Sequence, residues 1–321
     1  MELTAIEIIR RALDEEMSRD ESVYLLGEDV AAGGAFGVTR GLAEKHGARR
    51  VRNTPISEAA ITGLATGAAL CGLRPVLEIM FIDFATLAMD CLVNQAAKYR
   101  YMAGGQLSVP MVVRTQAGAA GGAAAQHSQS LESWFIHVPG LVVLAPSSPS
   151  EAYGLLKAAI RLDDPVLFIE HKRLYAMKEP LAQEEPLPIG RARVAREGSD
   201  ATLIAYSAMV RTALEAADQL ARDGISVEVI DLRSLVPLDM ATLVRSVAKT
   251  HRVVIAHEAV EMGGVGAEVA ARLGVAAFDE LDAPIMRVGC PFAPIPFAPE
   301  LEQALLPGTR RIEQAVRELA S

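Results

Sequence analysis

The chain has 321 residues, with 31 Lys and Arg against 40 Asp and Glu, which gives a net charge of −9. At about 100–200 residues per domain, this length predicts two domains, and 51% hydrophobic residues let each bury a core. A negative chain without a basic run makes nucleic acid an unexpected partner, because phosphate binding needs clustered Lys and Arg.

The cysteines and the N-terminal residues indicate the compartment. The three cysteines, Cys71, Cys91 and Cys290, lie far apart and form no C-x-x-C pair, so we expect neither a disulfide scaffold nor a zinc ribbon. The chain starts with no apolar run, so no signal or transit peptide is seen. No uncharged stretch offers the about 20 apolar residues that a membrane span needs. We therefore expect a soluble, cytoplasmic protein with no membrane partner.

Strands and helices alternate over the first 171 residues. Thr4 and Glu7 form a T-x-x-E capping box, which predicts a helix to about residue 19, and Ser57 is a candidate N-cap for a helix ending near residue 70. The other predicted elements are strands over 23–26, 75–80, 110–114, 141–145 and 166–170, and helices over 83–102 and 149–161. This alternation predicts βαβ units and a largely parallel sheet.

Residues 172–198 break the rhythm with Pro180, Pro186 and Pro188 and predict a linker. A second set follows, with strands over 202–206, 227–231, 253–257 and 285–288, and helices over 210–223, 240–249, from the glycine loop at 263–266 to about 275, and near 310–319. We expect an α/β protein with two open, largely parallel sheet domains. The first covers residues 1–188, with the linker starting at about 172, and the second covers residues 189–321.

Most motifs of nucleophiles and nucleotide sites are missing from the sequence. There is no G-x-S-x-G elbow, no P-loop and no H-E-x-x-H. The nearest match to a dinucleotide fingerprint, Gly264-Val265-Gly266-Ala267-Glu268-Val269, has Val where the third small residue belongs. A tight loop that leads into a helix explains this segment more simply.

Candidate side chains cluster at predicted strand ends, where open parallel sheets bind ligands. Glu28 follows the strand over 23–26. Glu58 begins a helix among small and apolar neighbours, where burial suits a carboxyl to proton transfer; a solvated glutamate in a first turn is the alternative. Phe84 is either a core residue or a platform for a cofactor. Asp90 stands in an otherwise apolar helix, where an unpaired buried carboxylate is costly.

His127 ends the Gly/Ala loop over 117–125 and stands between Gln126 and Ser128. A histidine on a mobile loop at a strand end is a candidate general acid or base. A lone histidine is also a common structural residue, so the position alone leaves both roles open.

Taken together, these segments resemble one family. The chain is similar to the beta subunit of thiamine-diphosphate-dependent 2-oxo acid dehydrogenases, the decarboxylating component of the pyruvate and branched-chain complexes. The acetoin dehydrogenase beta subunit has a similar pattern. The segments that carry the resemblance, in family order, are LGED at 26–29, TPISE at 54–58, GLRP at 72–75, QHSQS at 126–130, PGL at 139–141, DLRSLVPLD at 231–239 and LDAP at 281–284.

The resemblance implies a pyrimidine-binding α/β domain followed by a transketolase C-terminal-like domain. It also implies oxidative decarboxylation of a 2-oxo acid, pyruvate or branched-chain, with acyl transfer to a lipoyl group. Thiamine diphosphate is then shared with an alpha subunit in an α2β2 assembly, and a lipoyl acyltransferase is a further partner. In this family pattern Glu58 is the proton partner of the aminopyrimidine ring, Phe84 stacks on that ring, and Ile56 and Met80 lie around it. His127 helps in substrate handling and in acylation of the lipoyl arm.

Further positions follow from the same resemblance. Glu28 belongs to the cofactor site and, with Asp90, matches acids of a proton path that some relatives use. The chain has no Gly-Asp-Gly motif, so we expect the alpha subunit to hold magnesium and this chain alone to be inactive. Some relatives also bind potassium at positions that match Ala159, Ile160 and Asp164.

Three other functions stay open. One is the beta subunit of an acetoin dehydrogenase. Another is the C-terminal half of a split transketolase, which usually carries T-H-Q where this chain has Gln126-His127-Ser128. The last is a scaffold without catalytic activity.

Overall fold

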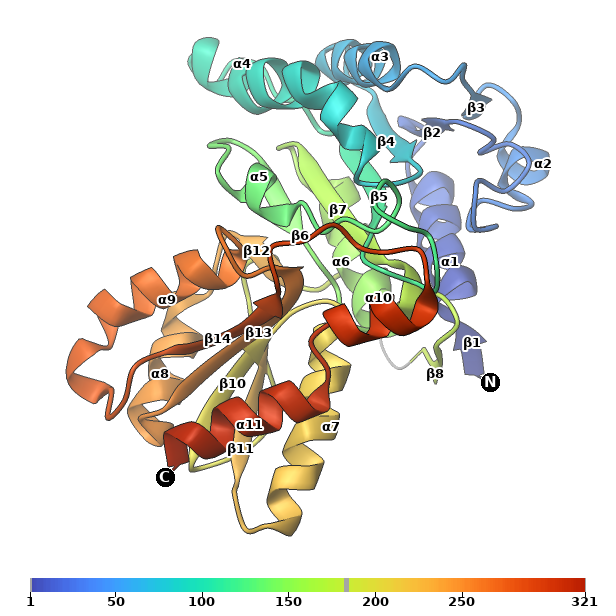
Figure 1. The fold of residues 1–321 in the computed structure, drawn as a ribbon. Coiled ribbons are helices and arrows are strands. Elements are labelled where there is room, and N and C mark those ends of the chain that lie inside the picture. Colours follow the sequence, from blue (N-terminus) through green and yellow to red (C-terminus); the bar gives the residue numbers. More distant parts are fainter. Residues whose placement is uncertain (1, 182–184, 321) are drawn as a thin grey trace. The chain divides into compact units, whose positions relative to one another are not determined.

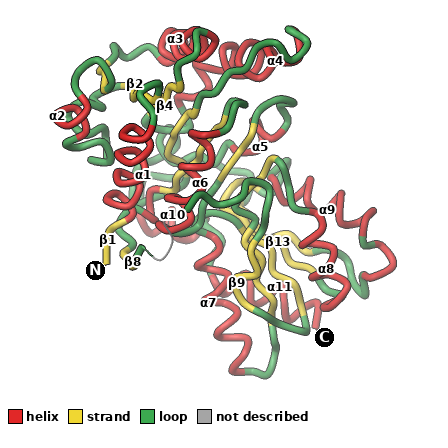
Figure 2. The backbone as a smooth tube through the Cα atoms, turned by 180° about the vertical axis from the view of Figure 1, so that it is seen from behind, coloured by secondary structure: helices red, strands yellow, loops and turns green. Residues whose placement is uncertain are grey.

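The computed structural model describes residues 2–181 and 185–320, so residues 182–184 of the predicted linker lie outside the described part. The chain divides into two compact units. The first contains Met1–Ala117 and Trp134–Ile189, and the second contains Gly118–Ser133 and Gly190–Ser321. Each unit is built around a largely parallel sheet with helices packed on it, which confirms the predicted fold class (Figure 1, Figure 2).

The sheet of the first unit is parallel throughout. Its strand order is β6 (Val142–Leu144), β7 (Val166–His171), β5 (Val112–Ala117), β4 (Arg74–Ile79), β2 (Val23–Gly27) and β3 (Val51–Asn53). The chain runs from β2 to β3 on one side and then crosses to β4 on the other side. The carboxyl ends of β2 and β4 therefore flank the switch point of the sheet, the place where open α/β sheets bind ligands.

Helices cover this sheet because its strands are apolar on both faces. Helix α1 (Ala5–Arg19) and helix α6 (Pro149–Arg161) share one buried cluster with strand residues such as Leu25 and Phe168. Both helices have the predicted bounds, and the capping box of Thr4 and Glu7 is present. Helix α3 (Glu58–Leu70) packs on β4. The remaining elements of the unit are α2 (Leu42–His46) and the antiparallel pair β1 (Glu2–Thr4) and β8 (Lys178–Pro180), with a 3₁₀ turn at Lys172–Leu174.

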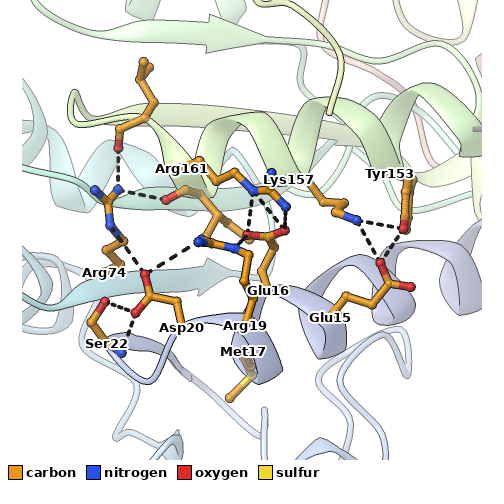
Figure 3. A network of polar contacts seen from close by, with 12 residues as sticks. Glu15, Glu16, Met17, Arg19, Asp20, Ser22, Arg74, Tyr153, Lys157 and Arg161 are labelled. Atoms are coloured by element: carbon orange, nitrogen blue, oxygen red, sulfur yellow. Dashed lines mark hydrogen bonds and ion pairs between the residues drawn. The ribbon is translucent and has the colours of Figure 1, made fainter. Parts of the chain in front are cut away.

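Ion pairs join α1 to α6 (Figure 3). Glu16 is fully buried and accepts hydrogen bonds from Arg161 Nη2 at 2.6 Å and from Arg19 Nε at 2.8 Å. One turn away, Lys157 Nζ lies 2.8 Å from Glu15 Oε2. Burial raises the pKa of Glu15, but hydrogen bonds, first from Lys157, outweigh this and lower the pKa to about 2. These pairs fix the two helices against each other on the same face of the sheet.

The segment after β4 departs from the single helix predicted over residues 83–102. It forms a 3₁₀ turn at Phe84–Ala88, a π-helical stretch at Asp90–Ala96 and the α-helix α4 (Ala97–Met102). This segment packs on α3, where Cys91 Sγ donates to the Ala59 carbonyl at 3.4 Å and a Cβ at Gly63 would lie 3.5 Å from Cys91 Sγ. No local sequence signal predicts such a tertiary contact.

The sheet of the second unit has the strand order β14 (Met286–Cys290), β13 (Val253–Val260), β10 (Ala201–Ala205), β11 (Val227–Asp231) and β9 (Arg193–Arg196). Only the edge strand β9, which the sequence analysis missed, is antiparallel within this sheet. The chain goes from β10 to β11 and then back across to β13. The switch point of this sheet therefore lies between β10 and β13.

Alternation along β10 sets the two helix layers of the second unit. Leu203 faces the buried cluster of α7 (Met209–Arg222) and α11 (Thr309–Ala320). The neighbouring Thr202 points the other way, where its hydroxyl lies 2.6 Å from the hydroxyls of Ser246 and Thr250 on α8 (Met240–Thr250). Helix α9 (Val265–Ala276) packs beside α8 (Figure 1). The short elements of this unit are β12 (Ser234–Val236), a 3₁₀ turn at Phe278–Glu280 and α10 (Pro299–Leu305). Helix α5 (Glu132–Ile136) begins in the second unit and ends in the first.

The glycine loop before α9 serves packing. A Cβ at Gly264 would lie 2.5 Å from the His257 ring, and one at Gly266 would lie 2.7 Å from it. Only glycine lets this loop approach the buried histidine so closely, which agrees with a tight loop that leads into a helix. In the described ranges, no helix is long and apolar enough to cross a membrane.

Candidate active site

Two carboxylates lie near the switch point of the first sheet. Glu28 directly follows β2, and Glu58 is the first residue of α3. Gly27 makes this arrangement possible, because it has a φ of +153° and a Cβ there would lie 2.7 Å from the Glu78 carbonyl. The amide of Thr54 donates to the Gly27 carbonyl at 3.0 Å, which ties the segment that leads to Glu58 to the end of β2.

Glu28 is half-buried, and its Oε1 has no hydrogen-bond partner among the residues that the structure describes. Burial raises the pKa of this carboxyl, and the negative charges of Glu58 and Asp29 raise it further. Such a carboxyl holds a proton more readily than an exposed glutamate does. It is therefore suited to exchanging a proton with a neighbouring group.

Glu58 is 6% exposed, and no residue in the described part of the chain donates a hydrogen bond to its carboxylate. Ser57 occupies the predicted N-cap position, but its side chain makes no capping hydrogen bond. The hydroxyl of Thr62 donates to the Glu58 carbonyl at 2.6 Å and fixes the first turn of the helix. The Glu58 carboxylate oxygens are not among the enclosed polar atoms without a partner, so they keep access to solvent and are open to a polar ligand.

The three apolar candidates, Ile56, Met80 and Phe84, differ in how far their side chains are exposed. The Phe84 ring lies edge-on to Phe81, with centroids 5.7 Å apart and an angle of 86°, so its orientation is fixed. Phe84 and Met80 are each half-buried, and Ile56 is 82% exposed. Each of the three therefore has apolar surface that the described chain does not cover.

Asp90 does not have the environment that the sequence argument assumed. Its side chain is exposed and accepts a hydrogen bond from Asn94 Nδ2 at 2.8 Å. The assumption of a costly buried carboxylate at this position is therefore wrong, because the side chain reaches solvent and has a hydrogen-bond donor.

His127 lies in the segment Gly118–Ser133 of the second unit. The amide of Gly118 donates to the Gln129 carbonyl at 3.1 Å, which closes residues 118–129 into a loop, and the His127 amide donates to the Ala124 carbonyl at 3.4 Å. The side chain of His127 is half-buried. Loops closed in this way can hold an acid–base group while leaving one side of it accessible.

The sequence analysis missed four buried residues of the second unit that carry polar side chains: Glu132, Tyr206, His257 and Glu258. Glu132 is fully buried, and its Oε2 has no partner in the described ranges; burial and then the charge of Glu258 raise its pKa to about 7. Burial lowers the pKa of His257 to about 4, and it raises that of Tyr206 well above 10. Tyr206 follows β10, and His257 and Glu258 lie on β13, so the strand-end rule used for Glu28 would have found them.

The described residues hold no cluster of metal-binding side chains. In residues 2–181 and 185–320, no group of three or more His, Cys, Asp or Glu side chains could hold a metal ion. At the expected potassium position, the Ile160 carbonyl accepts from Arg74 Nη1 at 3.0 Å, and Asp164 accepts from Arg100 Nη1 at 2.6 Å. The Ala159 carbonyl accepts from the amide of Leu162. Each of these oxygens accepts one hydrogen bond and has a further lone pair, so the potassium site stays a prediction.

Comparisons with known proteins agree with the geometry. Residues 1–178 match the model of the transketolase pyrimidine-binding domain, and residues 190–312 match that of the transketolase C-terminal domain. The chain is 48% identical to the mitochondrial pyruvate dehydrogenase E1 component subunit beta-2 of Oryza sativa subsp. japonica, over 98% of this chain and 86% of that protein. It is 46% identical to the pyruvate dehydrogenase E1 component subunit beta of Rickettsia felis, over 99% and 98% of the two chains.

Two further matches widen the range of activities among similar proteins. The beta subunit of acetoin:2,6-dichlorophenolindophenol oxidoreductase from Cupriavidus necator is 46% identical, over 96% of this chain and 95% of that protein. Among solved structures, a split gene transketolase described as an inactive beta4 tetramer superposes with a TM-score of 0.81. That match has 25% identity and covers 99% of this chain and 98% of the other.

Proposed function

Because the chain belongs to the family of pyruvate dehydrogenase E1 and acetoin oxidoreductase beta subunits, built from the two transketolase domains, we propose that it is the beta subunit of the decarboxylating component of a 2-oxo acid dehydrogenase complex. The reaction is oxidative decarboxylation of a 2-oxo acid, with pyruvate the first candidate, and transfer of the acyl group to the lipoyl arm of an acyltransferase. The observation that carries this proposal is Glu58, which is only 6% exposed, begins α3 beside the switch point of the first sheet and keeps its carboxylate oxygens open to a ligand.

The residues at the first switch point fit thiamine diphosphate. Glu58 would accept and return a proton at the aminopyrimidine ring, which gives its carboxylate the polar partner that it lacks. Phe84 would stack on that ring, and Ile56 and Met80 would cover its edges. Such stacking is worth only about 0.5–1.5 kcal/mol beyond burial, so the main effect of Phe84 is to orient the ring.

When bound, the cofactor supplies an electron sink for the carbanion that decarboxylation leaves behind. The chain supplies proton transfer at Glu58, with Glu28 as a second carboxyl whose raised pKa lets it hold a proton near Glu58. His127 would act as an acid or base toward the substrate and the lipoyl sulfur, as its resemblance to the family implies.

The chain needs a partner for this activity. The sequence has no Gly-Asp-Gly motif for a metal-bound diphosphate, so an alpha subunit would hold magnesium and the diphosphate in an α2β2 assembly. The test mixes the purified chain with thiamine diphosphate, magnesium, pyruvate and dichlorophenolindophenol, with and without a co-expressed alpha subunit. We expect dye reduction only with the alpha subunit; turnover by this chain alone would contradict the proposal.

The acetoin reaction is the second candidate, because the acetoin oxidoreductase beta subunit is as similar as a pyruvate dehydrogenase beta subunit, at 46% identity each. The same reconstituted pair, given pyruvate, branched-chain 2-oxo acids and acetoin in turn, decides among them by kcat/KM. The split transketolase is less similar, at 25% identity. Ketol transfer between sugar phosphates by the pair would be the result that favours it.

A further inference from the structure

Two carboxylates of the second unit bind the backbone of the loop that carries His127. Gly121 donates its amide to Glu302 Oε1 at 2.9 Å, and Gly122 donates its amide to Glu302 Oε2 at 2.9 Å. At the start of the loop, the amide of Ala119 donates to Glu258 Oε1 at 2.5 Å. Hydrogen bonds to a carboxylate are stronger than those between neutral groups. The loop is thus held by the amides of Ala119, Gly121 and Gly122 before it reaches His127.

On α10 a charged residue is buried and its apolar neighbour is exposed, the reverse of the usual pattern of a surface helix. In α10, Glu302 is 6% exposed, whereas its apolar neighbour Leu301 is 61% exposed. No Arg or Lys of the described chain forms an ion pair with Glu302. The two loop amides are therefore the partners that compensate a buried negative charge, and burial of such a charge is costly without them.

The loop needs such a support because its sequence leaves it flexible. Gly121 and Gly122 have φ values of +83° and +85°, and Ala124 has a φ of +60°. A Cβ at Gly122 would lie 3.2 Å from the Phe297 carbonyl. Glycine loses more conformational freedom on ordering than any other residue. A bidentate carboxylate that accepts from two consecutive amides selects this conformation among many.

The position of the loop in the second unit also indicates that the fold holds it in place. Glu258 lies on β13, beside the switch point between β10 and β13, and Glu132 at the other end of the segment lies close enough for its pKa to be raised by Glu258. The place where open α/β sheets usually bind a ligand is thus occupied by the segment 118–133 of the chain itself. The second sheet therefore supports this loop.

We propose that Glu302 is a positioning residue for His127, holding the loop over 118–129 through the amides of Gly121 and Gly122. This inference rests on the proposed function, in which His127 acts on the substrate and the lipoyl arm. Displacement of a reacting group by about 1 Å can cost about 10²-fold in rate. Loss of one anchor should therefore reduce catalysis without removing the acid–base group.

The test substitutes Glu302→Gln in the reconstituted complex with the alpha subunit. Glutamine keeps one acceptor oxygen and turns an NH₂ group toward the second amide, so one of the two anchors is lost. We expect the kcat of lipoyl acylation to fall about tenfold, with the KM of the 2-oxo acid nearly unchanged. Hydrogen exchange of the loop peptide over 118–129 should become at least tenfold faster. Glu300→Gln, an exposed glutamate on the same helix, is the matched control and should change neither.

Two comparisons separate positioning from a general structural role. The double variant with His127→Ala should acylate no more slowly than His127→Ala alone, because both changes act through His127. If Glu302→Gln does not fold, Gly122→Ala is the second variant. It disturbs the same loop and keeps the Glu302 side chain, and we expect the same fall in kcat and the same faster hydrogen exchange. Unchanged loop exchange, or additive effects in the double variant, would overturn the inference. An unchanged rate in His127→Ala would instead contradict the proposed role of His127, and the exchange result would still show whether Glu302 holds the loop.

Discussion

The pKa of the Glu28 carboxyl is raised, first by burial and then by the negative charge of Glu58. The two residues belong to different elements, the end of β2 and the start of α3, and meet at the switch point of one sheet. The charge of Glu58 therefore raises the affinity of the Glu28 carboxyl for a proton.

This coupling predicts the effect of Glu58→Gln on Glu28. Removing the charge of residue 58 should lower the pKa of Glu28, while the part that burial causes remains. The measurement is a pH titration of the Glu28 side-chain carboxyl signal by NMR in a chain labelled with ¹³C at glutamate. Glu44→Gln, an exposed glutamate of α2, is the control. An unchanged titration of Glu28 in Glu58→Gln would contradict the coupling.

A second prediction concerns Glu132. Its pKa is about 7 in the folded chain against an ordinary 4.5, so folding binds a proton in this range and stability falls as the pH rises from 4.5 through 7. The loss at pH 8 is on the order of 3 kcal/mol. His257 acts in the opposite direction, because a pKa of about 4 against 6.5 makes stability rise from pH 4 to 6.5.

Glu132→Gln should remove the first effect and keep the second. We expect the variant to gain stability relative to the parent chain as the pH rises from 5 to 8, as measured by urea unfolding at both values. A difference between the two proteins that is the same at pH 5 and pH 8 would show that Glu132 does not titrate in this range.

A third prediction concerns the buried core of the first unit. Arg114 is fully buried and donates to Glu170 through Nε at 2.7 Å and Nη2 at 2.8 Å, and to Glu78 through Nη1 at 2.7 Å. Tyr175 adds a hydroxyl donor to Glu170 at 2.5 Å. Arg114→Met leaves two buried carboxylates without a cation and should cost about 3–5 kcal/mol of unfolding free energy.

The control for this change is an exposed ion pair. Arg211 pairs with Glu215 on the surface of α7, and Arg211→Met should cost no more than about 0.5 kcal/mol. Urea unfolding of both variants at pH 7 makes the comparison. A cost for Arg114→Met as small as that of the control would show that the buried network contributes little.

Local signals in the sequence predicted much of the fold. The capping box of Thr4 and Glu7 marked the start of α1, the predicted end near residue 19 agrees with its bounds, and the predicted strand over 227–231 matches β11. The single helix predicted over 83–102 was wrong in detail, because the segment forms a 3₁₀ turn, a π-helical stretch and a short α-helix. Asp90 was expected to be buried because its neighbours in the sequence are apolar, but its side chain is exposed.

The sequence also predicted one part of the candidate site and not another. Glu28 and Glu58 could be found from strand ends and from the resemblance, and their roles stay predictions until they are tested. Glu302 could not be found, because it lies 181 residues after Gly121 along the chain and nothing in its helix marks it as buried. Long-range pairing of a side chain with a backbone amide leaves no pattern in a single sequence.

The central claim is that this chain contributes the proton-transferring carboxylate of a shared thiamine diphosphate site. The most direct measurement is the rate of 2-oxo acid decarboxylation by the complex with the alpha subunit, carrying Glu58→Gln and, as a control, Glu44→Gln. We predict a loss of about 10²-fold or more for Glu58→Gln, the usual effect of a proton-transfer group, and no loss for the control. A Glu58→Gln complex that keeps the rate of the parent complex would contradict the claim and favour a scaffold without catalytic activity.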